Sequence, residues 1–241
     1  MPTNDLIVVA VVALVGACVQ FLTGFGFSLT TVPLLALAID TRTASMLAAI
    51  LALTTSSAQA WLGRRHTVWP VVGRMCLWAA FGMPLGLWLF TDASERGLKL
   101  FLGISTLVLV GLLIRGIDVS RVGGTVDVVA GFVAGVLTTS INTNGPPLAF
   151  VLQARRLSAA SFRATITTIF VSVGLVGLAL RVWKGGMTHK VWSGLAVAPP
   201  SMLIGGLTGF RLRPHIDGPR FARAVQLLLV LAALSAIAAA L

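Results

Sequence analysis

The chain has 241 residues, of which 57% are hydrophobic and only 10% are charged, and its mean hydropathy is +0.97. About a quarter of the residues in a soluble domain are charged, so this composition excludes an ordinary soluble fold and indicates a polytopic integral membrane protein. The formal net charge of +11 does not indicate a nucleic-acid-binding protein, because the basic residues are spread over short loops and do not gather on one face.

Apolar runs between charged or Pro- and Gly-rich breaks predict eight helical blocks. Six have the length of a single helix that crosses a hydrocarbon layer about 30 Å thick. The other two are too long for one span and are interrupted by Gly, Pro and polar residues. The first block lacks a basic leader and is followed at once by further spans, so we interpret it as a membrane segment and not as a signal peptide. In chain order, the blocks are residues 6–39, 43–62, 68–90, 97–114, 125–153, 160–182, 189–210 and 221–241.

The two interrupted blocks, 6–39 and 125–153, open the two halves of the chain. This arrangement predicts an internal repeat, with residues 1–118 and 119–241 as the two membrane repeats of one integrated transmembrane domain. A shift of about 120 residues places Gly24 near Asn144. The predicted fold class is therefore all-α, with a Gly/Pro-broken helical hairpin at the start of each repeat.

Charge counting favours a hairpin over a single crossing for each interrupted block. If each block crossed once, alternate loops would carry 10 and 8 Lys and Arg residues, which decides nothing. If each enters and leaves on the same face, the counts become 12 and 6. The hairpin arrangement gives the stronger positive-inside asymmetry. It also gives each half an odd number of passes, so it predicts two repeats of inverted topology with both termini outside.

The two breaks are the candidate substrate site, because polar and Gly/Pro-broken backbone at membrane depth survives where it is packed in protein or lines a cavity. Helix N-termini and neutral hydroxyl and amide donors suit an anion. Each residue also has a structural explanation, since Gly allows close helix packing, hydroxyls bond their own helix, and Pro marks a helix boundary. An arginine that starts the block after a hairpin either attracts anions or is simply retained in a loop. The candidate residues are Gly24, Gly26, Ser28, Thr139, Asn142, Thr143, Asn144, Gly145, Pro146 and Arg163.

A resemblance to a known family rests on the same residues. The stretch Gly24, Gly26, Ser28, Val32-Pro33 resembles the Gly-x-Gly-x-Ser-x-x-x-Val-Pro element of the TauE/SafE family of sulfite and organosulfonate transporters. Asn144-Gly145-Pro146-Pro147 resembles the family's Gly-Gly-Pro-Pro element, with Asn144 where the family commonly has Gly. The resemblance implies an anion permease of the bacterial inner membrane with substrates such as sulfite or a sulfonate.

The charge pattern also bears on the transport mechanism. No Asp, Glu, Lys or His lies well inside a predicted span, so the carboxylate or histidine relays of many proton-driven pumps are not expected. A negative interior drives an anion outward, with about 2.3 kcal/mol per charge for each 100 mV. The sequence therefore predicts export by alternating access, with a small anion and the lipid bilayer as partners.

Several alternatives remain at this point. They are an ion- or proton-coupled uptake permease, a channel, and a non-transporting membrane scaffold subunit. We do not expect an enzyme, because all three histidines fall in loops, away from any buried nucleophile. We expect no cofactor or metal, since Cys18 and Cys76 lie in apolar runs without ligand spacing. The anion and the oligomeric state stay open.

Overall fold

The computed structural model describes residues 1–94, 96–97, 104, 124–215 and 227. All regular structure in these residues is helical, which confirms the predicted all-α class. The predicted blocks 97–114 and 221–241 lie almost wholly outside the described residues. The described helices are α1 (Thr3–Thr23), α2 (Phe27–Leu35), α3 (Thr41–Gly63), η1 (Arg64–His66), α4 (Trp69–Asp92), α6 (Gly124–Ser140), α7 (Gly145–Ala154), α8 (Ala159–Trp183), α9 (His189–Leu212) and η2 (Arg213–His215).

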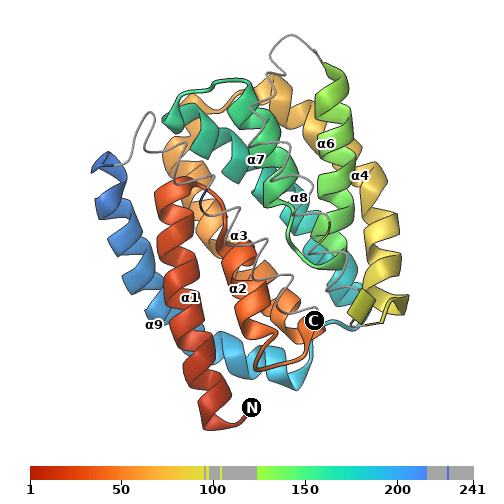
Figure 1. Cartoon of the computed structure of the whole chain (residues 1–241), viewed down its shortest axis with the longest axis vertical. Coiled ribbons are helices and arrows are strands. Elements are labelled where there is room, and N and C mark those ends of the chain that lie inside the picture. Colours follow the sequence, from red (N-terminus) through yellow and green to blue (C-terminus); the bar gives the residue numbers. More distant parts are fainter. Residues whose placement is uncertain (95, 98–103, 105–123, 216–226, 228–241) are drawn as a thin grey trace.

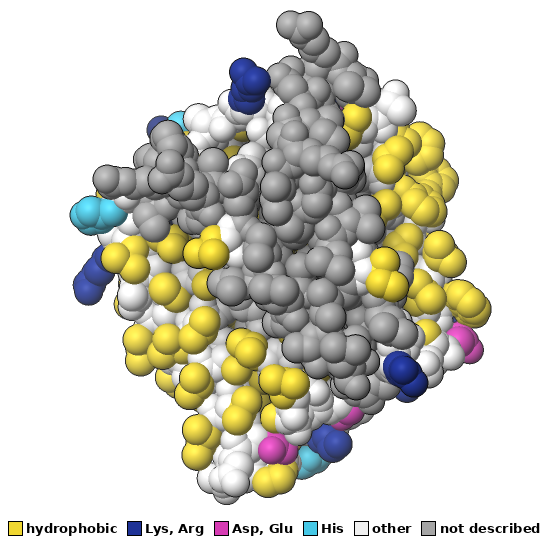
Figure 2. Space-filling model, in the orientation of Figure 1, with side chains coloured by type: hydrophobic (Ala, Val, Ile, Leu, Met, Phe, Trp, Pro, Cys, Tyr) yellow, Lys and Arg dark blue, Asp and Glu magenta, His cyan; other side chains and the backbone are white. Residues whose placement is uncertain are grey.

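The surface of the molecule is that of a membrane protein. Five of the described helical segments are long and apolar enough to cross a membrane. Hydrophobic side chains cover the flank, while charged side chains lie towards the ends of the molecule (Figure 2). Five of the six tryptophans are exposed near helix ends, where they form the aromatic belts typical of the two membrane interfaces. These five are Trp61, Trp69, Trp88, Trp183 and Trp192.

Each interrupted block folds back on itself around a short break (Figure 1). In the first, residues 36–40 return to Met1, Pro2 and Asp5 beside the start of α1 and share a surface hollow with them. In the second, Asp127 at the start of α6 pairs with Arg155, directly after α7. Both arms of each hairpin therefore meet at one end of the molecule. The first hairpin opens at the lower end in Figure 1, which carries the N-terminus, and the second opens at the upper end.

Glycines set the closest helix contacts between the two halves of the chain. On α4, Gly82 and Gly86 lie against the backbone of Phe132 and Val136 on α6. Because both partners advance by four residues, α4 and α6 run in the same direction. The glycines have no side chain, so the two backbones approach closely, as in other small-residue membrane interfaces.

The first and last described long helices form the equivalent pair. On α9, Gly205 and Gly209 lie against Leu14 and Cys18 of α1, again in parallel. By contrast, α3 and α8 run antiparallel, because the end of α3 at Gly63 contacts Ala164 near the start of α8, whereas Gly174, later in α8, contacts Leu53, earlier in α3. The first helix of each half is thus packed on the last described long helix of the other half, while the third helices face each other.

The glycine contacts predict a large difference between two identical substitutions on α4. A Cβ at Gly82 would overlap the Phe132 carbonyl oxygen, whereas a Cβ at Gly73 would meet nothing within 4 Å. Gly82→Ala should therefore lower the free energy of unfolding by about 1–3 kcal/mol, the usual cost of overpacking. Gly73→Ala should leave it unchanged or raise it slightly, because Ala favours helix. Thermal unfolding of the purified variants in detergent measures both, and equal effects at the two positions would contradict the close α4–α6 contact.

Candidate functional site

The tips of the two hairpins meet inside the helical bundle. The Nδ2 of Asn142, in the second break, donates a 2.8 Å hydrogen bond to the Ser28 hydroxyl oxygen at the start of α2. Gly145, the first residue of α7, lies against the side chains of Phe25 and Leu29. Residues about 115 positions apart in the chain are thereby brought to one place.

A small cavity of about 30 Å³ lies between the two tips. A cavity of this size holds roughly two water molecules. The N-termini of α2 and α7 both border it, and none of its described lining residues is ionisable. Its described lining is Gln20, Gly26, Phe27, Ser28, Leu29, Ala49, Ala52, Leu53, Ser56, Asn142, Thr143, Asn144, Gly145, Phe170 and Gly174.

The first break is built by two glycines in the left-handed region. Gly24 has φ +91° and ends α1, with its N–H bonded to the carbonyl of Gln20 at 2.7 Å. Gly26 has φ +96° and precedes α2. Only glycine adopts these angles without strain. The Gln20 side chain then accepts the N–H of Phe27 and donates to the Ser56 hydroxyl at 2.7 Å, so it ties the break to α3.

The second break uses asparagine in place of glycine. Asn142 has φ +56°, a left-handed conformation that Asn tolerates better than other side chains. Asn144 has an ordinary φ of −82°, and its Nδ2 donates to the Thr138 hydroxyl at 2.7 Å. The asparagine at position 144, where the family commonly has Gly, therefore causes no backbone strain. Pro146 and Pro147 have no N–H to offer, so the donors at this tip are largely side chains.

The structure brings six of the ten predicted site residues to the cavity and leaves four outside its lining. Gly24 packs against Arg163, whose Nε donates to the Leu22 carbonyl at 3.1 Å. The Thr139 hydroxyl donates to the Met83 carbonyl, and Pro146 is buried in the first turn of α7. A role in substrate binding stays a prediction for all ten. The six that line the cavity are Gly26, Ser28, Asn142, Thr143, Asn144 and Gly145.

Three polar residues near the tips were not predicted as site residues. Gln20 lies one turn before the first break, within α1. Ser56 is one of four consecutive hydroxyl residues, 54–57, and nothing in the sequence distinguishes it from the other three. Arg181 falls at the end of a predicted block, where a cation is normally interfacial, yet its side chain is fully buried and its Nη2 donates to Asn142 Oδ1 at 3.3 Å.

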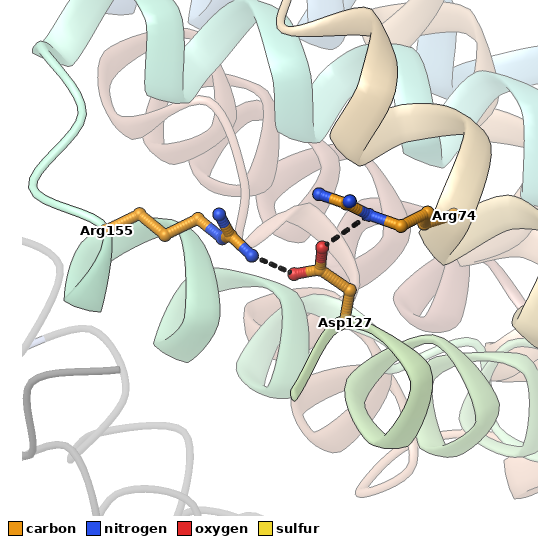
Figure 3. A network of polar contacts seen from close by, with 3 residues as sticks. All are labelled: Arg74, Asp127 and Arg155. Carbon is orange, nitrogen blue, oxygen red and sulfur yellow. Dashed lines mark hydrogen bonds and ion pairs between the residues drawn. The ribbon is translucent and has the colours of Figure 1, made fainter. Parts of the chain in front are cut away.

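An ionic cluster around the buried carboxylate of Asp127 holds the open end of the second hairpin (Figure 3). Asp127 has no exposed surface and accepts from Arg74 Nε on α4 at 2.9 Å and from Arg155 Nη2 at 2.8 Å. Its position in the first turn of α6 also places the negative charge at the favourable end of the helix dipole. The cluster joins α4, α6 and the end of α7, about one helix length from the cavity.

The helical bundle, with a small cavity between the tips of two broken hairpins, defines a polytopic membrane protein. The chain belongs to the TauE/SafE family of membrane transporters, since the family described as "Sulfite exporter TauE/SafE" matches residues 8–236. It is 30% identical over 193 residues to "Probable inner membrane transporter protein TsaS" of Comamonas testosteroni, covering 77% of this chain and 79% of that protein. It is 25% identical over 214 residues to "Probable sulfite/organosulfonate exporter TauE" of Cupriavidus necator, covering 84% and 82%. No solved structure matches the chain significantly.

These similarities confirm the family predicted from the two short motifs. Together with the membrane-length helices they also confirm a multi-pass protein of the inner membrane. The chain is thus a membrane transporter, which is consistent with the expectation that it is not an enzyme.

Proposed function

We propose that this protein exports a small sulfur-containing or organic anion, such as sulfite or a sulfonate, and binds it between the two hairpin tips. One observation carries the proposal: the N-termini of α2 and α7 border a single cavity whose described lining offers amides and hydroxyls but no carboxylate. Two helix N-termini directed at one place create a positive potential without a fixed charge. Neutral donors can then coordinate oxyanion oxygens without the cost of burying an unpaired ion.

The names of the relatives support this substrate class. The Cupriavidus necator protein is described as a sulfite/organosulfonate exporter and the Comamonas testosteroni protein as an inner membrane transporter. The chain covers about four fifths of each of them. The sulfonate and sulfite groups both carry three oxygens on one side of a sulfur atom, an arrangement that several converging neutral donors would fit.

The packing of the helices supports two inverted repeats, residues 1–118 and 119–241. The pairs α1 with α9 and α4 with α6 are the same contact with the halves exchanged, and both are parallel. The antiparallel pair α3 and α8 is the contact that a two-fold axis in the membrane plane would create. Such an axis turns the second half upside down relative to the first, as in other transporters with inverted repeats.

The same arrangement supports transport by alternating access. A cavity of about 30 Å³ is too small for an organosulfonate, so the tips must separate to admit one. Rocking one half against the other would separate Asn142 from Ser28 and open the cavity first to one face and then to the other.

The distribution of charge supports an orientation with the upper end in the cytoplasm. Judged from the helix ends, eight of the described Lys and Arg residues and one acidic residue, Asp127, lie at the upper end. Five of the described Lys and Arg residues and three acidic residues lie at the lower end, so the upper end is the more basic. Outward movement of an anion is then favoured by the membrane potential, about 2.3 kcal/mol per charge for each 100 mV. The upper cations are Arg64, Arg65, Arg74, Arg155, Arg156, Arg163, Arg211 and Arg213, and the lower ones are Arg42, Arg96, Arg181, Lys184 and Lys190.

The proposal is tested by flux of sulfite and methanesulfonate in proteoliposomes under an imposed potential of either sign. We expect saturable flux that follows the potential. Asn144→Leu should reduce it at least tenfold, because it replaces a cavity donor while its φ of −82° suits any residue. Asn4→Leu, an identical change at an exposed position in α1, is the matched control and should leave flux unchanged.

The other outcomes point to the alternatives. Flux that requires a proton or sodium gradient would replace the exporter with a coupled uptake permease. Flux that does not saturate would indicate a channel. No flux of any tested anion from protein that is folded and inserted would favour the scaffold role and overturn the proposal.

A further inference from the structure

Arg181 is a buried cation for which the described structure offers almost no compensation. Its side chain has no exposed surface, although it lies only two residues from the end of α8. One nitrogen, Nη2, reaches Asn142 Oδ1 at 3.3 Å, whereas Nε and Nη1 have no hydrogen-bond partner in the described structure. The guanidinium carbon lies 5.8 Å from the centre of the Phe90 ring, near the outer limit of a cation–π contact.

Other arginines in the described structure show what a structural role looks like. Arg42, at the same end of the bundle, donates from Nε and Nη2 to the carbonyls of Phe90, Thr91 and Ala93, in the last turn and at the C-cap of α4. Arg155 is paired with a carboxylate. A buried charge without a partner costs several kcal/mol. Packing therefore does not explain the position of Arg181, whereas a bound anion would.

We propose that Arg181 is an anion-binding residue that takes the oxyanion head of the transported substrate on the lower side of the cavity. This inference rests on the proposed function, which it deepens. Arg181 contacts the same Asn142 that bridges to Ser28 at the cavity. Only Asn142 therefore separates the guanidinium from the cavity, and the Nε and Nη1 donors of Arg181 have no partner in the described structure. When the second tip moves away from Ser28, two oxygens of a sulfite or sulfonate can bind the planar fork, the geometry that arginine favours.

The location gives the residue a direction-dependent role. Arg163 and Arg181 lie near the two ends of α8, about 27 Å apart along the helix. Arg163 reaches the first hairpin at Leu22, and Arg181 reaches the second at Asn142. In the proposed orientation Arg181 is on the outer side, so it receives the anion from the cavity before release.

The test is anion-dependent thermal stabilisation of the purified full-length protein in detergent, with sodium sulfite or methanesulfonate against sodium chloride at equal ionic strength. Wild type should be stabilised by the oxyanions. In Arg181→Gln, that stabilisation should be lost, with affinity reduced at least tenfold. Its melting temperature without oxyanion should be equal to or higher than that of wild type, because an uncompensated charge has been removed. A structural role predicts the reverse, a lower melting temperature with unchanged affinity.

Two further variants keep the test decisive. Arg42→Gln removes an arginine whose donors are already used, so it should lower the melting temperature but leave the oxyanion effect intact. Arg181→Lys preserves the charge but not the fork and should weaken oxyanion affinity several-fold. Wild-type affinity in both Arg181 variants would overturn the inference.

Failure of this inference differs from failure of the proposed function. Binding that depends on Arg181 without flux in proteoliposomes would support the site and contradict export. Flux with wild-type KM and maximal rate in Arg181→Gln would support export and contradict the site.

Discussion

Replacing Asp127 by Asn is expected to lower the free energy of unfolding by about 3–5 kcal/mol, the usual cost of removing one partner from a buried ion pair. Asp127 has no exposed surface and is bonded to Arg74 Nε and Arg155 Nη2 (Figure 3). Asparagine keeps the shape but cannot neutralise either guanidinium, of which that of Arg155 is largely buried. Since a whole domain is stable by only about 5–15 kcal/mol, we expect a strong loss of folded protein, measured by size-exclusion profile and melting temperature in detergent.

The matched control is Asp92→Asn, which makes the same chemical change on an exposed carboxylate at the end of α4. It should shift the stability by less than about 0.5 kcal/mol, as surface substitutions do. A small effect at Asp127, similar to that at Asp92, would mean that the cluster does not hold the second hairpin against α4. Because the cluster is far from the cavity, any Asp127→Asn protein that folds should retain its affinity for the anion.

The breaks in the two long blocks could be predicted from sequence because their signals are local. Gly24 and Gly26 interrupt one apolar run, and Asn142 to Pro147 interrupts the other. Each signal reflects backbone conformations or missing N–H groups that a continuous helix cannot accept. The block ends were also close to the helix ends, since charged residues and capping residues such as Asp40 and Ser158 mark them.

The partners of the breaks could not be predicted, because they depend on contacts between distant residues. Nothing in the sequence connects Gln20 with Ser56, or Asn142 with Ser28. Thr139 was a reasonable cavity candidate by composition, but the rotation of α6 turns its hydroxyl to the carbonyl of Met83. Helical periodicity gives the face of a helix only after its neighbours are known, and an all-apolar membrane helix gives little indication of them.

Arg181 illustrates how position along a helix can mislead. A cation within two residues of a helix end normally extends to the interface. Here the side chain points inward, over the ring of Phe90 and towards Asn142, and is fully buried. The sequence places it among loop charges, whereas the tertiary structure places it beside the second hairpin tip.

Replacing Asn142 by Asp is expected to raise the free energy of unfolding and, at the same time, to reduce anion transport strongly. Asn142 Oδ1 already lies 3.3 Å from Arg181 Nη2, so a carboxylate there would neutralise the buried guanidinium. A hydrogen bond to a charged group contributes about 1.5–3 kcal/mol, and we expect the unfolding free energy to rise by a similar amount. Aspartate also tolerates the φ of +56°, so the backbone should not change. Anion flux should fall at least tenfold, because a fixed negative charge occupies the oxyanion's place and repels it.

A double-mutant cycle separates this explanation from a general effect of Asn142. In an Arg181→Gln background, Asn142→Asp adds a carboxylate with no cation to neutralise, so it should destabilise the protein, and the coupling energy should be favourable. Asn142→Gly, which keeps the left-handed backbone but removes the side chain, should lower flux without raising stability. If Asn142→Asp lowers stability equally in both backgrounds, Arg181 does not need a negative partner and the cation has another role. If stability rises while flux is retained, the anion crosses the bundle without passing this arginine, and the route between the hairpin tips must be sought along the opposite side of the cavity, at Gln20 and Ser56.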